Sequence, residues 1–318
     1  MLLTSLLHTS GIDRLDAELL LGYVLQKPRT WLLAHPEFSL SEKEQKQFEI
    51  LAERRKNHEP IAYILGEKEF YGRKFFVDNR VLIPRPATEV LIDETKKMWN
   101  EVLRLRSAYV MPSKVLSASE ARSRGTSQSG ACTEPSRSAQ HDVYRITPAD
   151  SEIVIFSRIK KSLLIADRCE PVLSGVEGLI ADIGTGSGCI GITLALEIPE
   201  ARILCTDISE DALEVAKENA ARHGVSDRIT FEKADLHTFT PSHLHTQFLI
   251  VSNPPYIPSN TVLPSDVKNF EPHEALFAGG DGMDILTPLF EECLHQENCL
   301  GCILECREEQ AKKLSSHS

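Results

Sequence analysis

The tetrapeptide Asn253-Pro254-Pro255-Tyr256 has the residue types needed to hold a planar nitrogen, and it follows an apolar run at 248–251. Asn253 offers its side-chain carbonyl oxygen and Pro254 its backbone carbonyl as hydrogen-bond acceptors. The two prolines lack a backbone N–H and fix φ, so the acceptors are held without prolonging the strand. Tyr256 adds an aromatic ring that can stack on a substrate. The motif predicts a site that binds the N–H groups of an amide or amine while its lone pair attacks; a proline-rich turn without a ligand is the alternative.

A glycine-rich turn lies between an expected strand and an expected helix; its residues are Gly184, Thr185, Gly186, Ser187 and Gly188. Glycines let the backbone approach a ligand closely, and a helix N-terminus offers free N–H groups. Asp207 ends the next expected strand, where its carboxylate can accept hydrogen bonds from two ribose hydroxyls. Strand, turn, helix, strand and acid in this order predict a nucleoside site, whereas the turn alone is also compatible with no ligand.

The spacing of the glycines bears on which nucleoside this site would bind. The dinucleotide fingerprint requires its third glycine where Cys189 stands, but a cysteine can still pack closely, so NAD stays an alternative. S-adenosyl-L-methionine fits better, because Asp182 adds a carboxylate near a cationic ligand and no pyrophosphate has to be housed. A turn at Asp235 and Leu236 follows the third expected strand and would flank the adenine.

The elements that would position these residues alternate regularly. Strands are expected at 179–182, 202–207, 229–231, 248–251 and 302–305, and helices at 188–196, 211–223 and 285–296. This alternation is typical of an α/β fold with a doubly wound, mainly parallel, Rossmann-like sheet. Ligands bind such sheets outside the carboxyl ends of the strands, where the strand order reverses. We therefore expect the glycine-rich turn and Asn253 to face one crevice.

Three further segments precede this sheet. Residues 1–65 are expected to be helical, with a capping box at 41–44. A linking hairpin is expected over 70–77, with a further short strand at 81–83. The serine-rich stretch within 104–178 is typical of disorder, although the apolar runs at 153–156 and 163–165 have the composition of short strands. We interpret 104–178 as a low-complexity insertion that leaves the surrounding fold intact.

Composition argues against several functional classes. The 318-residue chain has a net charge of −11, whereas a protein that coats nucleic acid needs an excess of Lys and Arg. No apolar run approaches the length of a membrane span, and the first residues lack the charged start of a leader. A cytoplasmic protein is therefore expected, and we also expect it to be a monomer. Cys299 and Cys302 have a metal-ligand spacing but no second pair, so no metal site is expected.

Taken together, these motifs resemble those of the release-factor glutamine methyltransferases, which methylate N5 of the glutamine in a Gly-Gly-Gln motif. The resemblance covers most of the chain outside 104–178. It is carried by the segments 59–66 (Glu-Pro-Ile-Ala-Tyr-Ile-Leu-Gly), 70–72 (Phe-Tyr-Gly), 81–86 (Val-Leu-Ile-Pro-Arg-Pro), 182–188, 250–257, 270–273 (Phe-Glu-Pro-His), 275–277 (Ala-Leu-Phe) and 281–282 (Asp-Gly).

The resemblance implies an S-adenosyl-L-methionine-dependent enzyme with a peptide chain release factor as its partner. It implies a helical substrate-recognition domain at 1–66, a linking β-hairpin at 67–86 and a methyltransferase domain at 87–318. The implied cofactor contacts are Gly184, Thr185, Gly186, Ser187, Gly188, Asp207, Leu236 and Asn253. The implied substrate contacts are Asn253, Pro254, Pro255 and Tyr256, of which Asn253, Pro254 and Tyr256 would act in catalysis.

The end of the chain departs from the family pattern. The family's Glu-Ile-Gly is replaced by Glu305-Cys306-Arg307, and the chain stops at Ser318. This leaves no room for the last two strands of the sheet. We therefore expect a C-terminally truncated sheet with an exposed edge.

Three other functions fit parts of this pattern. A glutamine methyltransferase of a ribosomal protein is the nearest, although residues 85–89 favour the release-factor branch. An adenine-N6 DNA methyltransferase would use the Asn-Pro-Pro-Tyr motif on a flipped base. The acidic charge and the helical N-terminal domain count against it. The third alternative is an inactive, truncated copy.

Overall fold

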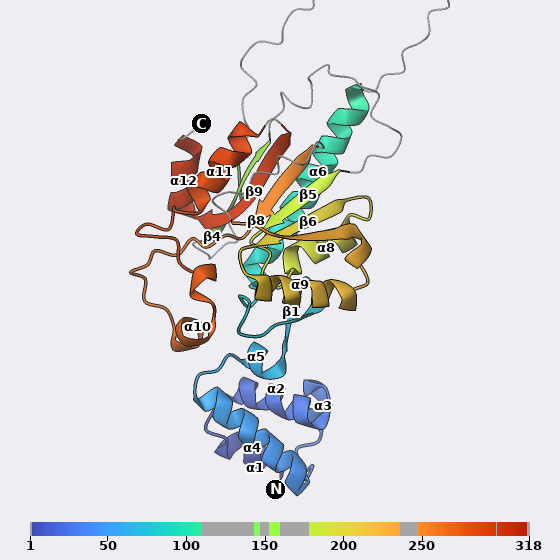
Figure 1. Cartoon of the computed structure of the whole chain (residues 1–318). Coiled ribbons are helices and arrows are strands. Elements are labelled where there is room, and N and C mark those ends of the chain that lie inside the picture. The colour runs from blue at the N-terminus through green and yellow to red at the C-terminus, as the bar shows by residue number, and fades with distance from the viewer. Residues whose placement is uncertain are drawn as a thin grey trace, which may run out of the picture.

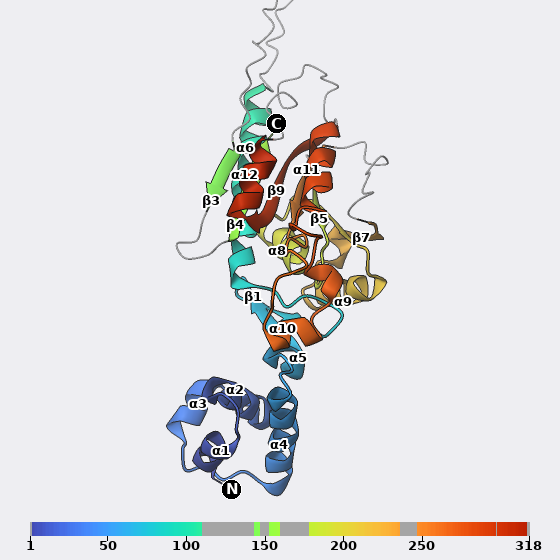
Figure 2. The same ribbon diagram turned by 90° about the vertical axis from the view of Figure 1, so that its left-hand side faces the viewer.

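The computed structural model describes residues 2–109, 143–146, 153–159, 178–235, 247–296 and 298–316. These residues form a small helical domain, a linking hairpin and a large α/β domain. The three parts follow one another along a long axis, and the two chain ends lie at opposite ends of it (Figures 1 and 2). The parallel sheet and the N-terminal helical domain confirm the expected fold class.

Residues 2–66, all of which are described, form five helices around an apolar core. These are α1 (Leu3–Thr9), α2 (Arg14–Leu25), α3 (Arg29–Ala34), α4 (Glu42–Lys56) and α5 (Ile61–Leu65). Leu20, Leu21 and Phe48 are buried in this core. The expected capping box is present: Ser41 Oγ accepts from the Glu44 N–H, and the Glu44 carboxylate accepts from the Ser41 N–H. These two hydrogen bonds cap the N-terminus of α4 at the position where the sequence predicts that the helix begins.

The linking hairpin consists of β1 (Glu67–Phe70) and β2 (Arg73–Phe76), which pair antiparallel. The further strand expected at 81–83 is not formed, since this stretch pairs with no strand of the described residues. Val81 and Ile83 are buried against the large domain. Their apolar character therefore reflects packing rather than strand pairing.

Within the described residues, the large domain contains a seven-stranded sheet in the order β3-β4-β9-β8-β5-β6-β7. Its five parallel strands are β5 (Leu179–Ile183), β6 (Arg202–Asp207), β7 (Ile229–Lys233), β8 (Phe248–Ser252) and β9 (Cys299–Arg307). The chain passes from β5 outward through β6 to β7 and then crosses to β8, on the other side of β5. The strand order reverses beside β5, so the loops that follow β5 and β8 meet in one crevice.

Helices cover both faces of this sheet (Figures 1 and 2). One face is covered by α6 (Glu89–Tyr109), α8 (Cys189–Glu197) and α9 (Glu210–Arg222), the other by α11 (Leu286–His295) and α12 (Glu308–Ser316). Successive strand residues face opposite layers: Ile180 packs with the first group of helices and Ala181 with the second. Burial on both faces explains why the sequences of these strands are mainly apolar and do not alternate with polar residues.

The exposed edge expected beyond β9 is not found. Instead, β9 pairs antiparallel with β4 (Ile153–Ile159), which pairs with β3 (Val143–Ile146). Both strands come from 104–178, so this segment adds two strands to the edge of the sheet, and the apolar run at 153–156 forms a strand as its composition indicated. The physical reason is that an open edge presents unpaired N–H and C=O groups, which another extended segment of the chain can satisfy. The apolar run at 163–165 lies outside the described residues.

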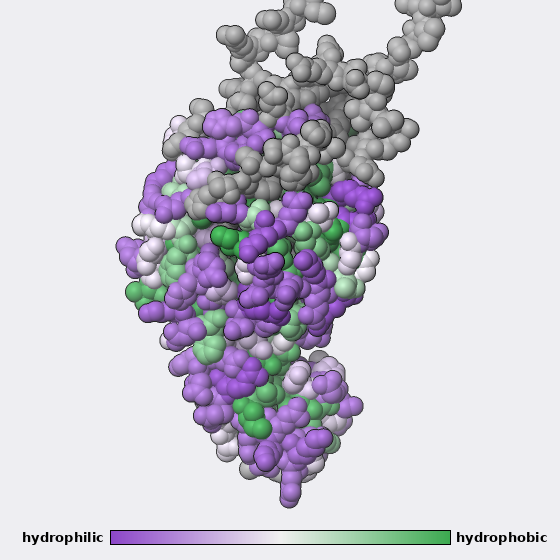
Figure 3. Space-filling view, in the orientation of Figure 1, coloured by the Kyte–Doolittle hydropathy of each residue, from purple (hydrophilic) through white to green (hydrophobic). Residues whose placement is uncertain are grey.

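The described surface is mainly polar. On the face in Figure 3, hydrophilic residues surround small apolar islands. Exposed large apolar side chains such as Leu33, Ile50 and Val262 are scattered over different elements. Among the helices of the described ranges, none has the length and apolar character needed to cross a bilayer.

Candidate active site at the carboxyl ends of the parallel strands

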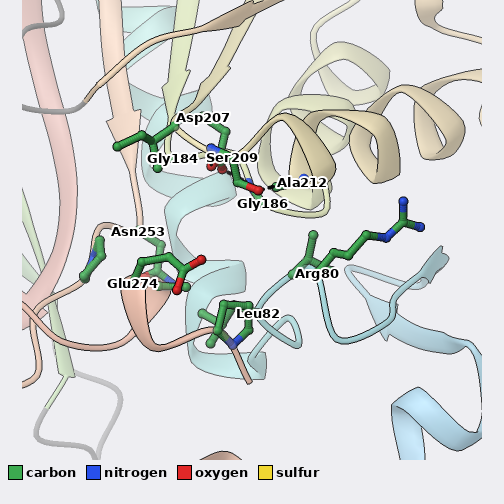
Figure 4. A pocket seen from close by; sticks show the side chains of 14 residues that line it. Arg80, Leu82, Gly184, Gly186, Asp207, Ser209, Ala212, Asn253 and Glu274 are labelled. Carbon is green, nitrogen blue, oxygen red and sulfur yellow. Dashed lines mark hydrogen bonds between the residues drawn. The ribbon is translucent and has the colours of Figure 1, made fainter. Parts of the chain in front are cut away.

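A pocket opens where the loops after β5, β6 and β8 meet two other segments: residues 80–82, which follow the hairpin, and the segment after α10 (Ser265–Phe270). In Figure 4, Asp207 and Gly186 lie on its upper side, and Asn253, Glu274 and Leu82 lie along its lower side. The lining residues are Arg80, Val81, Leu82, Gly184, Gly186, Asp207, Ile208, Ser209, Ala212, Asn253, Pro255, Pro272, Glu274 and Ala275. The pocket therefore lies at the reversal of strand order that the sequence predicts.

The glycine-rich turn is shaped by positive φ angles and by backbone hydrogen bonds to β6. The N–H groups of Gly184 and Thr185 both donate to the Thr206 carbonyl, each at 2.9 Å. Gly186 has φ +55°, and a Cβ there would meet no atom within 4 Å. Gly188 has φ +80°, and a Cβ there would lie 3.1 Å from Ala216 Cβ on α9. One glycine thus keeps the pocket wall open, and the other lets α8 pack against α9.

Asp207 lies at the end of β6 and is held by two backbone groups. Its Oδ2 accepts from the Gly186 N–H and its Oδ1 from the Ser209 N–H, each at 2.9 Å. Burial raises the pKa of Asp207, while these backbone hydrogen bonds oppose the increase and the nearby Glu274 adds to it. Each carboxylate oxygen retains a lone pair for a second donor, so the side chain can accept from a pair of hydroxyl groups in the pocket.

Asp182 lies beneath the turn rather than in the pocket wall. It is fully buried, and its Oδ2 accepts from Thr185 Oγ1 at 2.6 Å and from the Gly191 N–H at 2.8 Å. Burial raises the pKa of Asp182 to about 6. Its role in the structure is to join the turn to the first residues of α8, and that a carboxylate lies near a cationic ligand here stays a prediction.

Asn219 of α9 joins the glycine-rich turn to the linking hairpin. Its Nδ2 donates to the carbonyls of Phe76 (2.9 Å) and Ser187 (2.8 Å), and its Oδ1 accepts from the Phe76 N–H (2.7 Å). The side chain is fully buried. It thereby satisfies the N–H and carbonyl groups of Phe76, at the end of β2, and the carbonyl of Ser187 in the turn.

Asn253 follows β8 directly and has a fixed amide. Its Nδ2 donates to Thr88 Oγ1 at 3.1 Å. Just before it, Ser252 Oγ donates to the Ile183 carbonyl at 2.6 Å and ties the ends of β8 and β5 together. The amide nitrogen of Asn253 is thus engaged by the protein, and its oxygen is left to accept from a ligand.

Tyr256 reaches away from the pocket toward β9. Its hydroxyl donates to Glu305 Oε1 at 2.9 Å, and burial raises its pKa far above the usual range, so the hydroxyl keeps its proton. Glu305 is fully buried. The Asn-Pro-Pro-Tyr turn is therefore attached at one end to Thr88 and at the other to β9.

A buried carboxylate fixes the lower wall of the pocket to the segment 77–86, which follows the hairpin. Glu271 accepts from Arg85 Nη2 at 2.6 Å and from the Ile83 N–H at 3.3 Å. Its side chain is almost fully buried. This attachment holds the segment that carries Pro272 and Glu274 against the large domain.

Comparison with known proteins agrees with this geometry. The family model described as the PrmC N-terminal domain matches residues 2–66, and that described as the methyltransferase small domain matches residues 163–280. The release factor glutamine methyltransferase of Chlorobaculum tepidum is 36% identical over 269 residues, which cover 83% of this chain and 68% of that protein. That of Clostridium botulinum is 30% identical over 295 residues, covering 92% of this chain and 78% of that protein.

The chain belongs to the release factor glutamine methyltransferase family.

Another relative in this comparison is longer than the chain. The bifunctional methyltransferase of Rickettsia bellii is 36% identical over 309 residues, which are 95% of this chain but 46% of that protein. The chain thus spans less than half the length of such bifunctional relatives. Family membership accounts for the methyltransferase sheet and for the helical domain that precedes it.

In the structure, some but not all of the expected site residues line the pocket. Those that line it are Gly184, Gly186, Asp207, Asn253 and Pro255. Those that do not line it are Thr185, Ser187, Gly188, Pro254 and Tyr256. Leu236 lies outside the described residues. The roles assigned to all of them stay predictions.

Sequence reasoning missed the lower wall of the pocket and the residues that support it. Leu82, Pro272 and Ala275 line this wall, and Glu271 holds it in place. The motifs 81–86, 270–273 and 275–277 are part of the family resemblance, so a signal was present, but nothing local indicated that these segments meet. Within the described ranges, no group of three His, Cys, Asp or Glu side chains is arranged to hold a metal ion.

Proposed function

We propose that this chain transfers a methyl group from S-adenosyl-L-methionine to N5 of the glutamine in the Gly-Gly-Gln motif of a peptide chain release factor. The observation that carries this proposal is the side chain of Asn253. Its nitrogen is engaged by Thr88, so its oxygen is free to accept from a substrate N–H in the same pocket as Asp207. Membership of the family supports the choice of substrate.

The upper side of the pocket fits the nucleoside part of the cofactor. Asp207 would accept from both ribose hydroxyls, because each of its oxygens keeps a lone pair. Ile208 is 51% exposed and lines the pocket beside it, and its apolar surface suits one face of the adenine. The Gly186 backbone leaves open space where a side chain would stand. The carboxylate of Glu274 adds negative charge opposite Asp207, which suits a cationic ligand.

The cofactor supplies an electrophilic methyl group on a sulfonium. An amide nitrogen is a poor nucleophile because its lone pair is delocalised into the carbonyl. Asn253 Oδ1 and the Pro254 carbonyl would each accept one of the two N–H groups, which directs the lone pair at the methyl group. The N–C bond forms as the C–S bond breaks, and the nitrogen then releases a proton to water. Positioning of this kind supplies up to about 7–11 kcal/mol in the best intramolecular cases.

The remaining parts of the proposal concern the partner. We propose that the helical domain at 1–66 contacts the release factor. The Tyr256 ring does not line the pocket and its hydroxyl is bound to Glu305, so a contact of Tyr256 with the glutamine stays a prediction. That the protein is a monomer and that it is located in the cytoplasm both stay predictions.

The test uses the purified chain, S-adenosyl-L-methionine with a labelled methyl group, and three substrates in parallel. We expect label on a release factor and none on its variant with Gly-Gly-Ala in place of Gly-Gly-Gln. Label on ribosomal protein alone would favour the sister glutamine methyltransferases. Label on duplex DNA alone, which the net charge of −11 disfavours, would refute the glutamine proposal.

A matched pair of variants tests the role of the acceptor. Asn253→Ala should abolish methyl transfer and preserve most of the cofactor affinity, because Asp207 and the glycine-rich turn are unchanged. Asn100→Ala is the control, since this exposed asparagine lies on α6 of the large domain and does not line the pocket. Full turnover by Asn253→Ala would contradict the acceptor role.

A further inference from the structure

A buried carboxylate lies behind the Asn-Pro-Pro-Tyr turn, outside the pocket itself. Glu305 interrupts the apolar strand β9 and has no exposed surface. Its Oε1 accepts from the Tyr256 hydroxyl, and its Oε2 makes no hydrogen bond within the described part of the chain. A buried carboxylate with so few partners destabilises a fold, and an apolar side chain of similar shape would not. Such a local conflict is typical of a functional position.

The neighbours of Glu305 connect it with Asn253. Burial raises the pKa of Glu305, whereas the polar side chains of Thr88, Tyr256 and Asn253 and the charge of Arg85 favour its ionised form. Thr88 is buried, and its Oγ1 accepts from Asn253 Nδ2. The single hydrogen of the Thr88 hydroxyl is therefore left to point at the carboxylate.

The charge of Glu305 determines the direction of these hydrogen bonds. An ionised carboxylate accepts hydrogen bonds and cannot donate them. The Tyr256 and Thr88 hydroxyls must then donate toward Glu305, and Thr88 can only accept from Asn253. The oxygen and nitrogen of an amide are similar in shape, so this network decides which of them faces the pocket. With the Asn253 nitrogen turned toward Thr88, the oxygen is presented to the substrate.

We infer that Glu305 is a positioning residue: directly and through Thr88 it orients the Asn253 amide with its oxygen toward the substrate nitrogen, and through Tyr256 it holds the end of the same turn. The inference rests on the proposed function, because it explains how the acceptor is kept in the orientation that the reaction needs.

The test compares Glu305→Gln, Thr88→Val and Thr88→Ser with the unchanged chain. Glu305→Gln and Thr88→Val should each lower kcat by about 10- to 100-fold, as the loss of an orienting partner typically does. The dissociation constant of S-adenosyl-L-methionine should not change. Thr88→Ser keeps the hydroxyl and should restore kcat. The double variant Glu305→Gln/Thr88→Val should be no slower than the worse single variant, because both act through one network.

Two further measurements separate this role from a merely structural one. Glu94→Gln is the control, a buried glutamate on α6 whose carboxylate pairs with Lys97 instead. It should leave kcat unchanged. In the chain with ¹⁵N-labelled asparagine, the Asn253 side-chain NH₂ signals, assigned by their loss in Asn253→Ala, should move in Glu305→Gln and Thr88→Val but not in Thr88→Ser.

The outcomes distinguish the two proposals. No methyl transfer by the unchanged chain to any release factor would refute the proposed function, whereas the NH₂ signals would still report on the orientation of Asn253. A normal kcat in Glu305→Gln, with unmoved NH₂ signals, would overturn the inference. Thr88→Ser as slow as Thr88→Val would overturn it too, because a packing role would then suffice.

Discussion

Replacing Asn219 by leucine should weaken both the fold and the cofactor site, because this side chain connects α9, the hairpin and the glycine-rich turn. Leucine has a similar size but can make none of the three hydrogen bonds to Phe76 and Ser187. Ser187 is buried, so its carbonyl would be left without a partner, whereas the partly exposed Phe76 can recover some hydrogen bonds to water.

The magnitude follows from these environments. A buried polar group left unsatisfied costs about 1–3 kcal/mol, and a group that regains water costs nearer the low end of that range. One buried carbonyl and two partly hydrated groups add up to about 3–5 kcal/mol. A loss of that size is a large part of the roughly 5–15 kcal/mol that stabilises a typical domain.

The assay is urea unfolding followed by the fluorescence of Trp99, which is buried in the core of the α/β domain. The other tryptophan, Trp31, lies in the helical domain and is changed to phenylalanine in all samples, so that Trp99 is the single reporter. Cofactor affinity is measured by calorimetry on the same proteins. We expect Asn219→Leu to lower the free energy of unfolding by the amount above and to weaken cofactor binding.

Asn219→Asp sharpens the test. It keeps the shape and the acceptor for the Phe76 N–H, but its carboxylate would face two carbonyl oxygens at pH 7. It should therefore destabilise the domain at least as much as leucine does. A loss below about 1 kcal/mol for Asn219→Leu, the size expected for a lone exposed hydrogen bond, would refute the reasoning. So would normal stability of Asn219→Asp, since the two donor bonds would then contribute nothing.

Two further predictions concern the acidic residues around the pocket. Asp207→Asn should weaken binding of S-adenosyl-L-methionine by about 10- to 100-fold, because hydrogen bonds to a charged group contribute about 1.5–3 kcal/mol; the exposed neighbour Glu210, changed to glutamine, is the control in the same calorimetric titration. Equal affinities would exclude Asp207 as a cofactor contact. Asp182 has a folded-state pKa of about 6, raised by burial above its ordinary 3.8, so the folded chain binds more protons than the unfolded chain between these values. Its contribution to stability must therefore fall as the pH rises from about 4 to 6, by about 3 kcal/mol at most. Urea unfolding at several pH values should show this fall as the difference between the unchanged chain and Asp182→Asn, and a difference of the opposite slope would contradict the assignment.

Much of the candidate site could be predicted from the sequence because its chemistry lies at the ends of strands. Asp207 and Asn253 each follow an apolar run directly, and positive-φ turns such as that at Gly186 favour glycine. In a parallel sheet the carboxyl ends of neighbouring strands meet at one edge, so these separate local patterns imply a common pocket. The parallel order of β5, β6 and β8 follows from the same alternation of strands and helices.

The tertiary structure alone decided which distant residues support that site. Asn219 is 143 positions from Phe76, and Glu305 is 49 positions from Tyr256, so no local pattern connects either pair. Each is a polar residue in a helix or strand whose function depends on what packs against it. Asp182 shows the same effect, since only the structure reveals that it lies beneath the turn and supports the loop.

The outer edge of the sheet separates most clearly what the sequence determined from what only the tertiary structure decided. The sequence by itself determined that 302–305 would be a strand of the parallel sheet, because its apolar residues follow an expected helix. It did not determine what lies beside β9, since any extended segment can satisfy the N–H and C=O groups of an open edge. Pairing with β4 brings in residues 153–159, which sequence composition assigned to an insertion. Strand pairing is a contact between backbones, and backbones carry no residue-specific pattern by which a partner could be recognised in advance.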